Sequence, residues 1–125
     1  MTRTNRILVA EDNPVNQKVI IGMLKRLGFS ADIANNGAEV IKALGQDGYE
    51  LIFMDCQMPI LDGYGATKVI RASESEHIPI VALTANAMPG DEEKCLAAGM
   101  DDYIAKPLSI ITIQKTLDKY LCKES

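Results

Sequence analysis

The stretch RILVAEDNPVNQ, residues 6–17, carries the pattern that decides the fold. Its first five residues, apolar from Ile7 onward, predict a buried β-strand. Asn13 is a favourable N-cap residue and Pro14 suits the first helical position, so a helix is expected to begin there. Glu11 and Asp12 stand between the two elements. The stretch therefore predicts a β-α unit with two acidic side chains at the carboxyl end of its strand.

The same alternation of short apolar runs and longer amphipathic stretches continues through the chain. Strands are predicted at residues 6–10, 31–34, 51–54, 78–83 and 103–105, and helices at 14–27, 38–46, 64–72, 88–98 and 109–121. On the first helix, an apolar stripe is expected from Val15, Val19, Ile20, Met23, Leu24 and Leu27. The strands are uniformly apolar, as in parallel sheets covered by helices on both faces. The predicted fold class is α/β, a flavodoxin-like (βα)5 doubly wound parallel sheet with strand order 2-1-3-4-5.

Length and composition bound the classes of function. A chain of 125 residues with 47% hydrophobic and 24% charged residues fits one domain over residues 1–125, with its core at about 6–121. No apolar run reaches the roughly 20 residues of a membrane span, and the polar start is unlike a secretory signal, so a cytoplasmic location is expected. The net charge is −4 and basic residues are scattered, which disfavours nucleic-acid binding.

Polar side chains follow four of the five predicted strands. Glu11 and Asp12 come after the first, Asp55 after the third, Thr84 after the fourth and Lys106 after the fifth. In open α/β sheets these strand ends meet at one crevice, where ligands bind. Carboxylates that lie close together repel one another unless a cation neutralises them. Mg2+ prefers carboxylate oxygens as ligands, and Mn2+ fits the same ligands. Each residue alone also fits a structural role, such as a helix cap or a surface charge, but the joint pattern favours a phosphoryl-transfer site.

At these residues the sequence resembles the receiver domains of bacterial response regulators and hybrid histidine kinases. The matching stretches are residues 7–13, 54–59, 62–63, 82–85 and 106–107. Together and in this order they are specific, and the resemblance covers the chain from Arg6 to Leu121. The fine detail around residues 11–16, 84–88 and 99–103 is most like receivers attached to histidine kinases or phosphorelay proteins.

The resemblance implies an acceptor and a metal site. Asp55 would receive a phosphoryl group from a phosphohistidine on a partner. Glu11, Asp12, Asp55 and the backbone carbonyl of Gln57 would bind Mg2+. Glu11 departs from the commonest pattern, in which a second Asp stands at this position; the longer side chain still reaches the metal or its water shell. The resemblance therefore implies a role for Glu11 in metal binding and does not define its exact ligand geometry.

The resemblance also implies a switch. Thr84 and Lys106 would contact the phosphoryl group, and Tyr103 matches the position of an aromatic residue that moves with Thr84. The peptide between Lys106 and Pro107 is a candidate for the cis form. Phosphorylation would then change the surface around the fourth helix, the fifth strand and the last helix. A half-buried structural role for Tyr103 is compatible with this reading.

The implied function is a two-component phosphorelay step, with a histidine kinase or a histidine phosphotransfer domain as partner. The domain would promote its own phosphorylation and dephosphorylation, either alone or within a hybrid sensor histidine kinase tethered to a membrane. The first helix is the expected docking surface, through Asn16, Gln17, Lys18, Ile21, Gly22 and Arg26. A plain solvated face is the alternative there.

Three other functions compete with this reading. A degenerate receiver that acts only as an interaction module would have lost some of the five polar residues. A flavin carrier would need a phosphate-cradling loop where Glu11 and Asp12 stand. An aspartyl phosphatase would have a second acid in place of Gln57.

Overall fold

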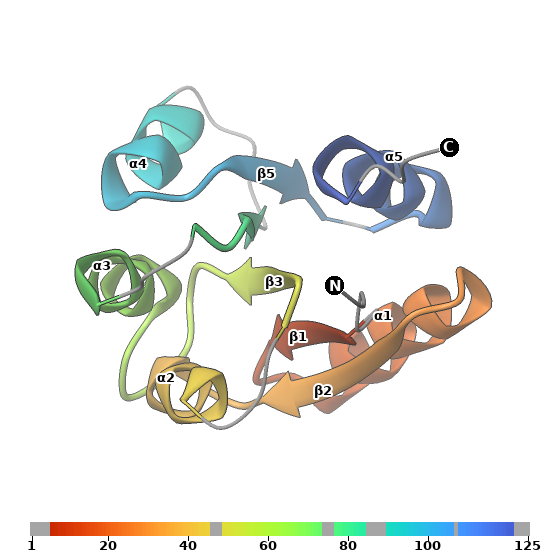
Figure 1. Cartoon of the computed structure of the whole chain (residues 1–125), viewed down its shortest axis with the longest axis horizontal. Coiled ribbons are helices and arrows are strands. Elements are labelled where there is room, and N and C mark those ends of the chain that lie inside the picture. The colour runs from red at the N-terminus through yellow and green to blue at the C-terminus, as the bar shows by residue number, and fades with distance from the viewer. Residues whose placement is uncertain (1–5, 46–48, 74–76, 85–89, 107, 122–125) are drawn as a thin grey trace.

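The computed structural model describes residues 6–45, 49–73, 77–84, 90–106 and 108–121 (Figure 1). The strands are β1 (Arg6–Ala10), β2 (Ser30–Ala34), β3 (Leu51–Asp55), β4 (Ile80–Thr84) and β5 (Asp102–Ala105). The helices are α1 (Pro14–Arg26), α2 (Gly37–Leu44), α3 (Gly63–Ser73), α4 (Asp91–Ala98) and α5 (Ile110–Tyr120). All strand pairs are parallel and the order is β2-β1-β3-β4-β5, which confirms the predicted fold class.

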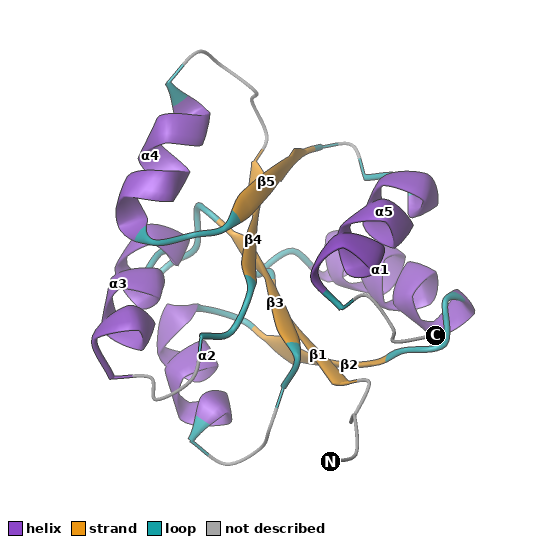
Figure 2. Cartoon of the chain, turned by 45° about the horizontal axis from the view of Figure 1, so that its top comes forward, coloured by secondary structure: helices purple, strands orange, loops and turns teal. Residues whose placement is uncertain are grey.

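The sheet is the middle of three layers (Figure 2). Helices α2, α3 and α4 cover one face, and α1 and α5 cover the other. Alternate strand residues therefore enter two separate cores: Leu8, Ile52 and Ala82 belong to the first, and Phe53 and Val81 to the second. Strands β1, β3 and β4 are buried on both faces, which explains their uninterrupted apolar sequences.

Local sequence accounts for the start and end of the first helix. The side chain of Asn13 accepts hydrogen bonds from the amides of Val15 and Asn16, and Pro14 occupies the first turn, as predicted. Gly28 follows the helix with φ +90°, a backbone conformation that favours glycine. The chain can therefore turn sharply from α1 into β2.

The predicted apolar stripe of α1 is wrong at two of its positions. Ile20 and Leu24 are buried and Met23 and Leu27 are partly buried, but Val15 is 68% and Val19 is 44% exposed. Only the side of α1 turned toward the sheet and α5 is covered, and it is narrower than the stripe. The structure therefore leaves two valines of α1 on the surface.

Some element boundaries in the structure differ from the predicted ones. β4 begins at Ile80 rather than at residue 78, and the carbonyl of Ile78 accepts a hydrogen bond from Arg71 Nη1. β3 extends to Asp55, so this acidic residue is the last of the strand. The predicted start of α4 at residue 88 lies outside the described residues. In the described part of the chain, no helix combines the length and the apolar character needed to cross a bilayer.

Candidate functional site

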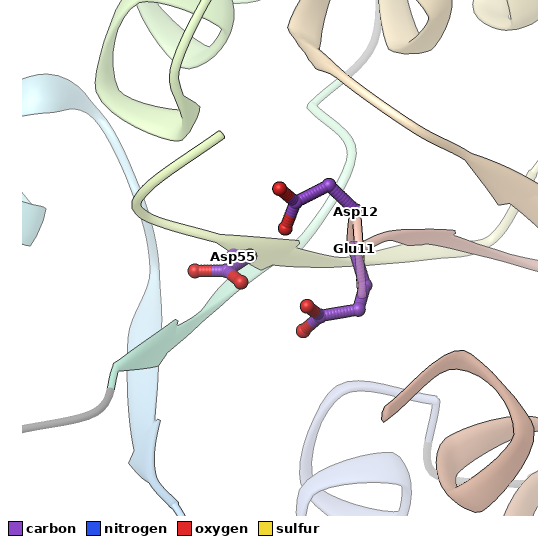
Figure 3. A group of neighbouring side chains, drawn as sticks. All are labelled: Glu11, Asp12 and Asp55. Carbon is purple, nitrogen blue, oxygen red and sulfur yellow. The ribbon is translucent and has the colours of Figure 1, made fainter. Parts of the chain in front are cut away.

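Three carboxylates meet at the carboxyl edge of the sheet (Figure 3). Glu11 and Asp12 directly follow β1, and Asp55 ends β3, which is the neighbour of β1. One oxygen of each side chain lies within 4.8 Å of the others. Glu11 and Asp55 are buried, at 2% and 7% exposure, whereas Asp12 is exposed. The parallel topology thus brings residues 11 and 55 together as the sequence predicts.

Lys106 provides the positive charge in this cluster. Its Nζ atom lies 3.1 Å from Glu11 Oε1 and 3.2 Å from Asp55 Oδ2. The backbone amide of Lys106 donates to the carbonyl of Thr84, which fixes the chain just beyond β5. The ammonium group therefore bridges two carboxylates that come from different strands.

Burial and neighbouring charges shift the pKa values of Glu11 and Lys106. Burial raises the pKa of Glu11, the negative charge of Asp55 raises it further, and hydrogen bonds from Lys106 and the Asn13 amide only partly offset this. Burial lowers the pKa of Lys106, but Asp55 and Glu11 together outweigh it, so the pKa of this lysine is raised. Lys106 therefore stays protonated at neutral pH, and the surroundings of Glu11 disfavour its charged form.

Amide groups from the start of α1 surround Glu11. The backbone N–H of Asn13 donates to Glu11 Oε2 at 3.2 Å, and Asn16 Nδ2 lies 3.5 Å from the same oxygen. Gln17 Nε2 donates to the backbone carbonyl of Glu11 at 2.5 Å. Asn16 and Gln17 were predicted to face outward, and this is wrong because both are half-buried against the site. The available sequence clue was their position, one turn into a helix that begins directly after the acidic pair.

The other predicted residues lie around the same edge. The backbone amide of Gln57 donates to Asp55 Oδ1 at 3.0 Å. Thr84 is the buried last residue of β4, and Tyr103 is half-buried on β5, opposite Ala82 in the register. Pro107 lies outside the described residues, and so does the predicted cis peptide. The structure thus gathers Glu11, Asp12, Asp55 and Lys106, and places Thr84 and Tyr103 on the two adjacent strands.

The donor set fits a divalent cation. Glu11, Asp12 and Asp55 offer carboxylate oxygens only, which are the ligands of hard ions such as Mg2+. The exposed Asp12 leaves one side of the cluster open to water, and Mg2+ usually retains several waters. The site therefore suits such an ion in the type of its ligand oxygens, in the number of its carboxylates and in its access to water.

Among the described residues, the cysteines do not belong to the cluster of possible metal ligands. Cys56 follows Asp55 directly and Cys95 lies on α4; both are buried and neither is in a disulfide. Burial raises the pKa of the Cys56 thiol to about 12. Cys56 and Cys95 are therefore buried, reduced thiols, while Cys122 lies outside the described residues.

Comparison with known proteins settles the family. The profile of the response regulator receiver domain matches residues 7–118. The chain belongs to this receiver domain family. Among solved structures, the receiver domain is similar to that of the sensor histidine kinase PA1611 from Pseudomonas aeruginosa PAO1, with a TM-score of 0.87 and 46% identity over 94% of this chain and 98% of that one. That crystal structure has a magnesium ion coordinated in the active site cleft.

Three further relatives are a receiver domain in complex with a histidine phosphotransfer protein and two histidine kinases. It is similar to a chain in the co-crystal structure of the Saccharomyces cerevisiae histidine phosphotransfer protein Ypd1 with the receiver domain of Ssk1, with a TM-score of 0.86, 34% identity and coverage of 94% and 88%. It is 43% identical to the hybrid signal transduction histidine kinase I of Dictyostelium discoideum over 94% of this chain. The chain spans only 7% of that relative, and 16% of the similar histidine kinase 5 of Arabidopsis thaliana.

Proposed function

We propose that this receiver domain accepts a phosphoryl group on Asp55 from a phosphohistidine of a histidine kinase or a histidine phosphotransfer protein. The observation that carries the proposal is the buried Asp55 carboxylate, held between Glu11, Asp12 and the ammonium group of Lys106. In the reaction, the P–N bond of the phosphohistidine breaks while a P–O bond to Asp55 forms, and the imidazole leaves. The product is an acyl phosphate on the domain.

The surrounding residues have separate roles in this proposal. Glu11, Asp12, Asp55 and the carbonyl of Gln57 hold Mg2+, with Mn2+ as a substitute. When bound, the ion offsets negative charge on the transferring group. Lys106 then contacts a phosphoryl oxygen, and Asp55 is aligned for in-line attack because Gln57 N–H already bonds its Oδ1 atom.

The acyl phosphate also drives a switch in this proposal. Thr84, at the end of β4, moves to contact the new phosphoryl group, and Tyr103 on the neighbouring β5 takes the space that Thr84 leaves. The surface of α4, β5 and α5 changes as a result, and partner proteins bind the changed surface. Within a longer protein, this step passes a signal from a histidine kinase along a phosphorelay.

Incubation with Mg2+ and acetyl phosphate tests the acceptor. Intact-mass measurement should show one added phosphoryl group on the wild type and none on Asp55→Asn. Asp118→Asn, on the exposed side of α5, is a matched control that should be phosphorylated like the wild type. Phosphorylation of Asp55→Asn, or none on the wild type, would reject Asp55 as the acceptor.

The exposed valines of α1 support a docking surface for the phosphohistidine partner. Val15 and Val19 are 68% and 44% exposed, and α1 begins two residues after Asp12. A partner helix that packs on these valines would lie beside Asp55, where its histidine must reach. Val19→Arg should slow phosphotransfer from a histidine phosphotransfer protein without slowing phosphorylation by acetyl phosphate. Ile111→Arg, at another exposed apolar residue, on α5, is the control, and equal transfer rates in both variants would contradict this surface.

A further inference from the structure

Gln17 connects two loops at the edge of the site. Its Nε2 atom donates to the backbone carbonyl of Glu11 at 2.5 Å and to the side-chain oxygen of Asn35 at 2.9 Å. Glu11 lies in the loop after β1, and Asn35 lies in the loop after β2. One side-chain amide of α1 therefore bonds both loops at once.

Asn35 is itself held in place by α2. The carboxylate of Glu39, in the first turn of α2, accepts hydrogen bonds from the Asn35 backbone amide at 2.7 Å and from its side-chain nitrogen at 3.2 Å. This leaves the Asn35 oxygen turned toward Gln17 as an acceptor. The bridge from Gln17 thus has a rigid helix at each end, α1 on one side and α2 on the other.

Glu11, at the centre of this arrangement, needs these hydrogen bonds to hold its side chain in one position. Glu11 has one more rotatable bond than Asp, so holding its carboxylate in one position costs more conformational entropy. Its Oε1 atom is fixed by Lys106 and its Oε2 atom by Asn13 and Asn16, while Gln17 fixes the backbone from which the side chain departs. Glu11 is thereby oriented toward Asp12 and Asp55 before any ion binds.

We propose that Gln17 is a positioning residue for divalent-cation binding: its amide bridge to Asn35 sets the backbone of Glu11 so that the three carboxylates meet. The proposal rests on the cation-dependent function proposed above. Gln17 touches neither the ion nor the phosphoryl group, and acts only through Glu11. Removing the amide should therefore weaken the affinity for Mg2+ more than it changes the stability of the ion-free fold.

Magnesium titration of Gln17→Met tests this role, because methionine keeps the length of the side chain and removes its donor. Isothermal titration calorimetry with MgCl2 gives the dissociation constant, and urea unfolding in EDTA gives the stability without the ion. We expect the dissociation constant of Gln17→Met to rise about tenfold. Gln114→Met, on the exposed side of α5, is the matched control and should bind Mg2+ like the wild type.

A second variant removes the other end of the bridge. Asn35→Ala keeps Gln17 but takes away its acceptor, and it should weaken Mg2+ binding in the same direction by a smaller factor. The Mg2+ concentration that gives half-maximal phosphorylation by acetyl phosphate should rise in both variants. This second variant also covers the case in which Gln17→Met does not fold.

The outcomes separate this proposal from the proposed function. If the wild type binds Mg2+ and is phosphorylated, but Gln17→Met and Asn35→Ala have wild-type dissociation constants, only the role of Gln17 is rejected. Loss of stability in EDTA with an unchanged dissociation constant rejects it as well, because the amide would then be purely structural. If the wild type neither binds Mg2+ nor takes a phosphoryl group, both proposals are rejected.

Discussion

Lys106 Nζ lies within hydrogen-bond distance of Asp55 Oδ2, at 3.2 Å, although Lys106 follows β5, Asp55 ends β3, and β4 lies between these two strands in the sheet. The same nitrogen lies 3.1 Å from Glu11 Oε1. One ammonium group, on the residue that follows β5, thus links Glu11, which follows β1, to Asp55, which ends β3. In the absence of a divalent ion, it is the positive charge that holds the acidic cluster together.

Removing that charge should destabilise the ion-free domain. Lys106→Met leaves Glu11 and Asp55 as buried carboxylates without their shared donor, so the free energy of unfolding should fall by about 1–3 kcal/mol. Urea unfolding in EDTA measures the loss, and added Mg2+ should reduce it. Lys119→Met, which removes an exposed partner of Asp102, is the control and should have a smaller effect. Equal losses in the two variants would show that Lys106 does not offset the repulsion.

Stability without metal should depend on pH through Glu11. Burial and then Asp55 raise its pKa in the folded state above the ordinary value of 4.5, so the folded protein retains a proton that the unfolded chain releases. The contribution of Glu11 is therefore fully favourable below pH 4.5 and is lost as the pH rises through the folded-state pKa. Glu11→Gln should become more stable than the wild type as the pH is raised from 4.5 to neutrality in EDTA.

The matched control for this pH profile is Glu92→Gln on the exposed side of α4. Its stability relative to the wild type should stay constant over the same pH range. Mg2+ should restore the wild type at neutral pH and have less effect on Glu11→Gln. A constant difference between Glu11→Gln and the wild type at every pH would contradict the assignment.

Ile60 holds an unfavourable backbone conformation in the loop between β3 and α3. Its φ is +70°, and the amide of Leu61 donates to the carbonyl of Pro59 at 2.7 Å, which closes a tight turn around it. A β-branched residue is strained there, and its side chain is 83% exposed. Ile60→Asn should raise the free energy of unfolding by about 1 kcal/mol, because Asn adopts positive φ more readily.

Ile111→Asn is the control for this substitution. Ile111 is also an exposed isoleucine, at 63%, but it lies within helix α5. Thermal or urea unfolding should show no gain in stability there, since Asn is no better than Ile in a helix. If both variants gain equally, the positive φ of Ile60 does not store strain.

Arg71 joins α3 to the segments before β4 and β5. Its Nε atom donates to the carbonyl of Gly99, Nη1 to the carbonyl of Ile78 and Nη2 to Asp101 Oδ2, each at 2.8 Å. A lysine cannot supply this planar set of donors, so Arg71→Lys should lower the free energy of unfolding by about 2 kcal/mol. Arg26→Lys, at the exposed end of α1, should change it by less than about 0.5 kcal/mol. A change in Arg71→Lys no larger than in this control would show that one donor is enough.

The sequence alone predicts the fold and the polar residues at the edge of the sheet. Strand periodicity and local caps depend on neighbouring residues, so Asn13 and Pro14 already mark the start of α1. In a parallel sheet, the carboxyl ends of neighbouring strands must lie side by side. That rule is enough to bring Glu11 and Asp55 together, although 44 positions separate them.

Only the tertiary structure decides which side chains of a helix are covered and which bonds cross between loops. Val15 and Val19 continue the apolar pattern of α1, yet they are exposed because none of the described elements packs over them. Asn16 and Gln17 look like surface residues, yet they bond to Glu11 and Asn35. Burial and hydrogen bonding depend on elements distant in sequence, so the periodicity of one helix cannot specify them.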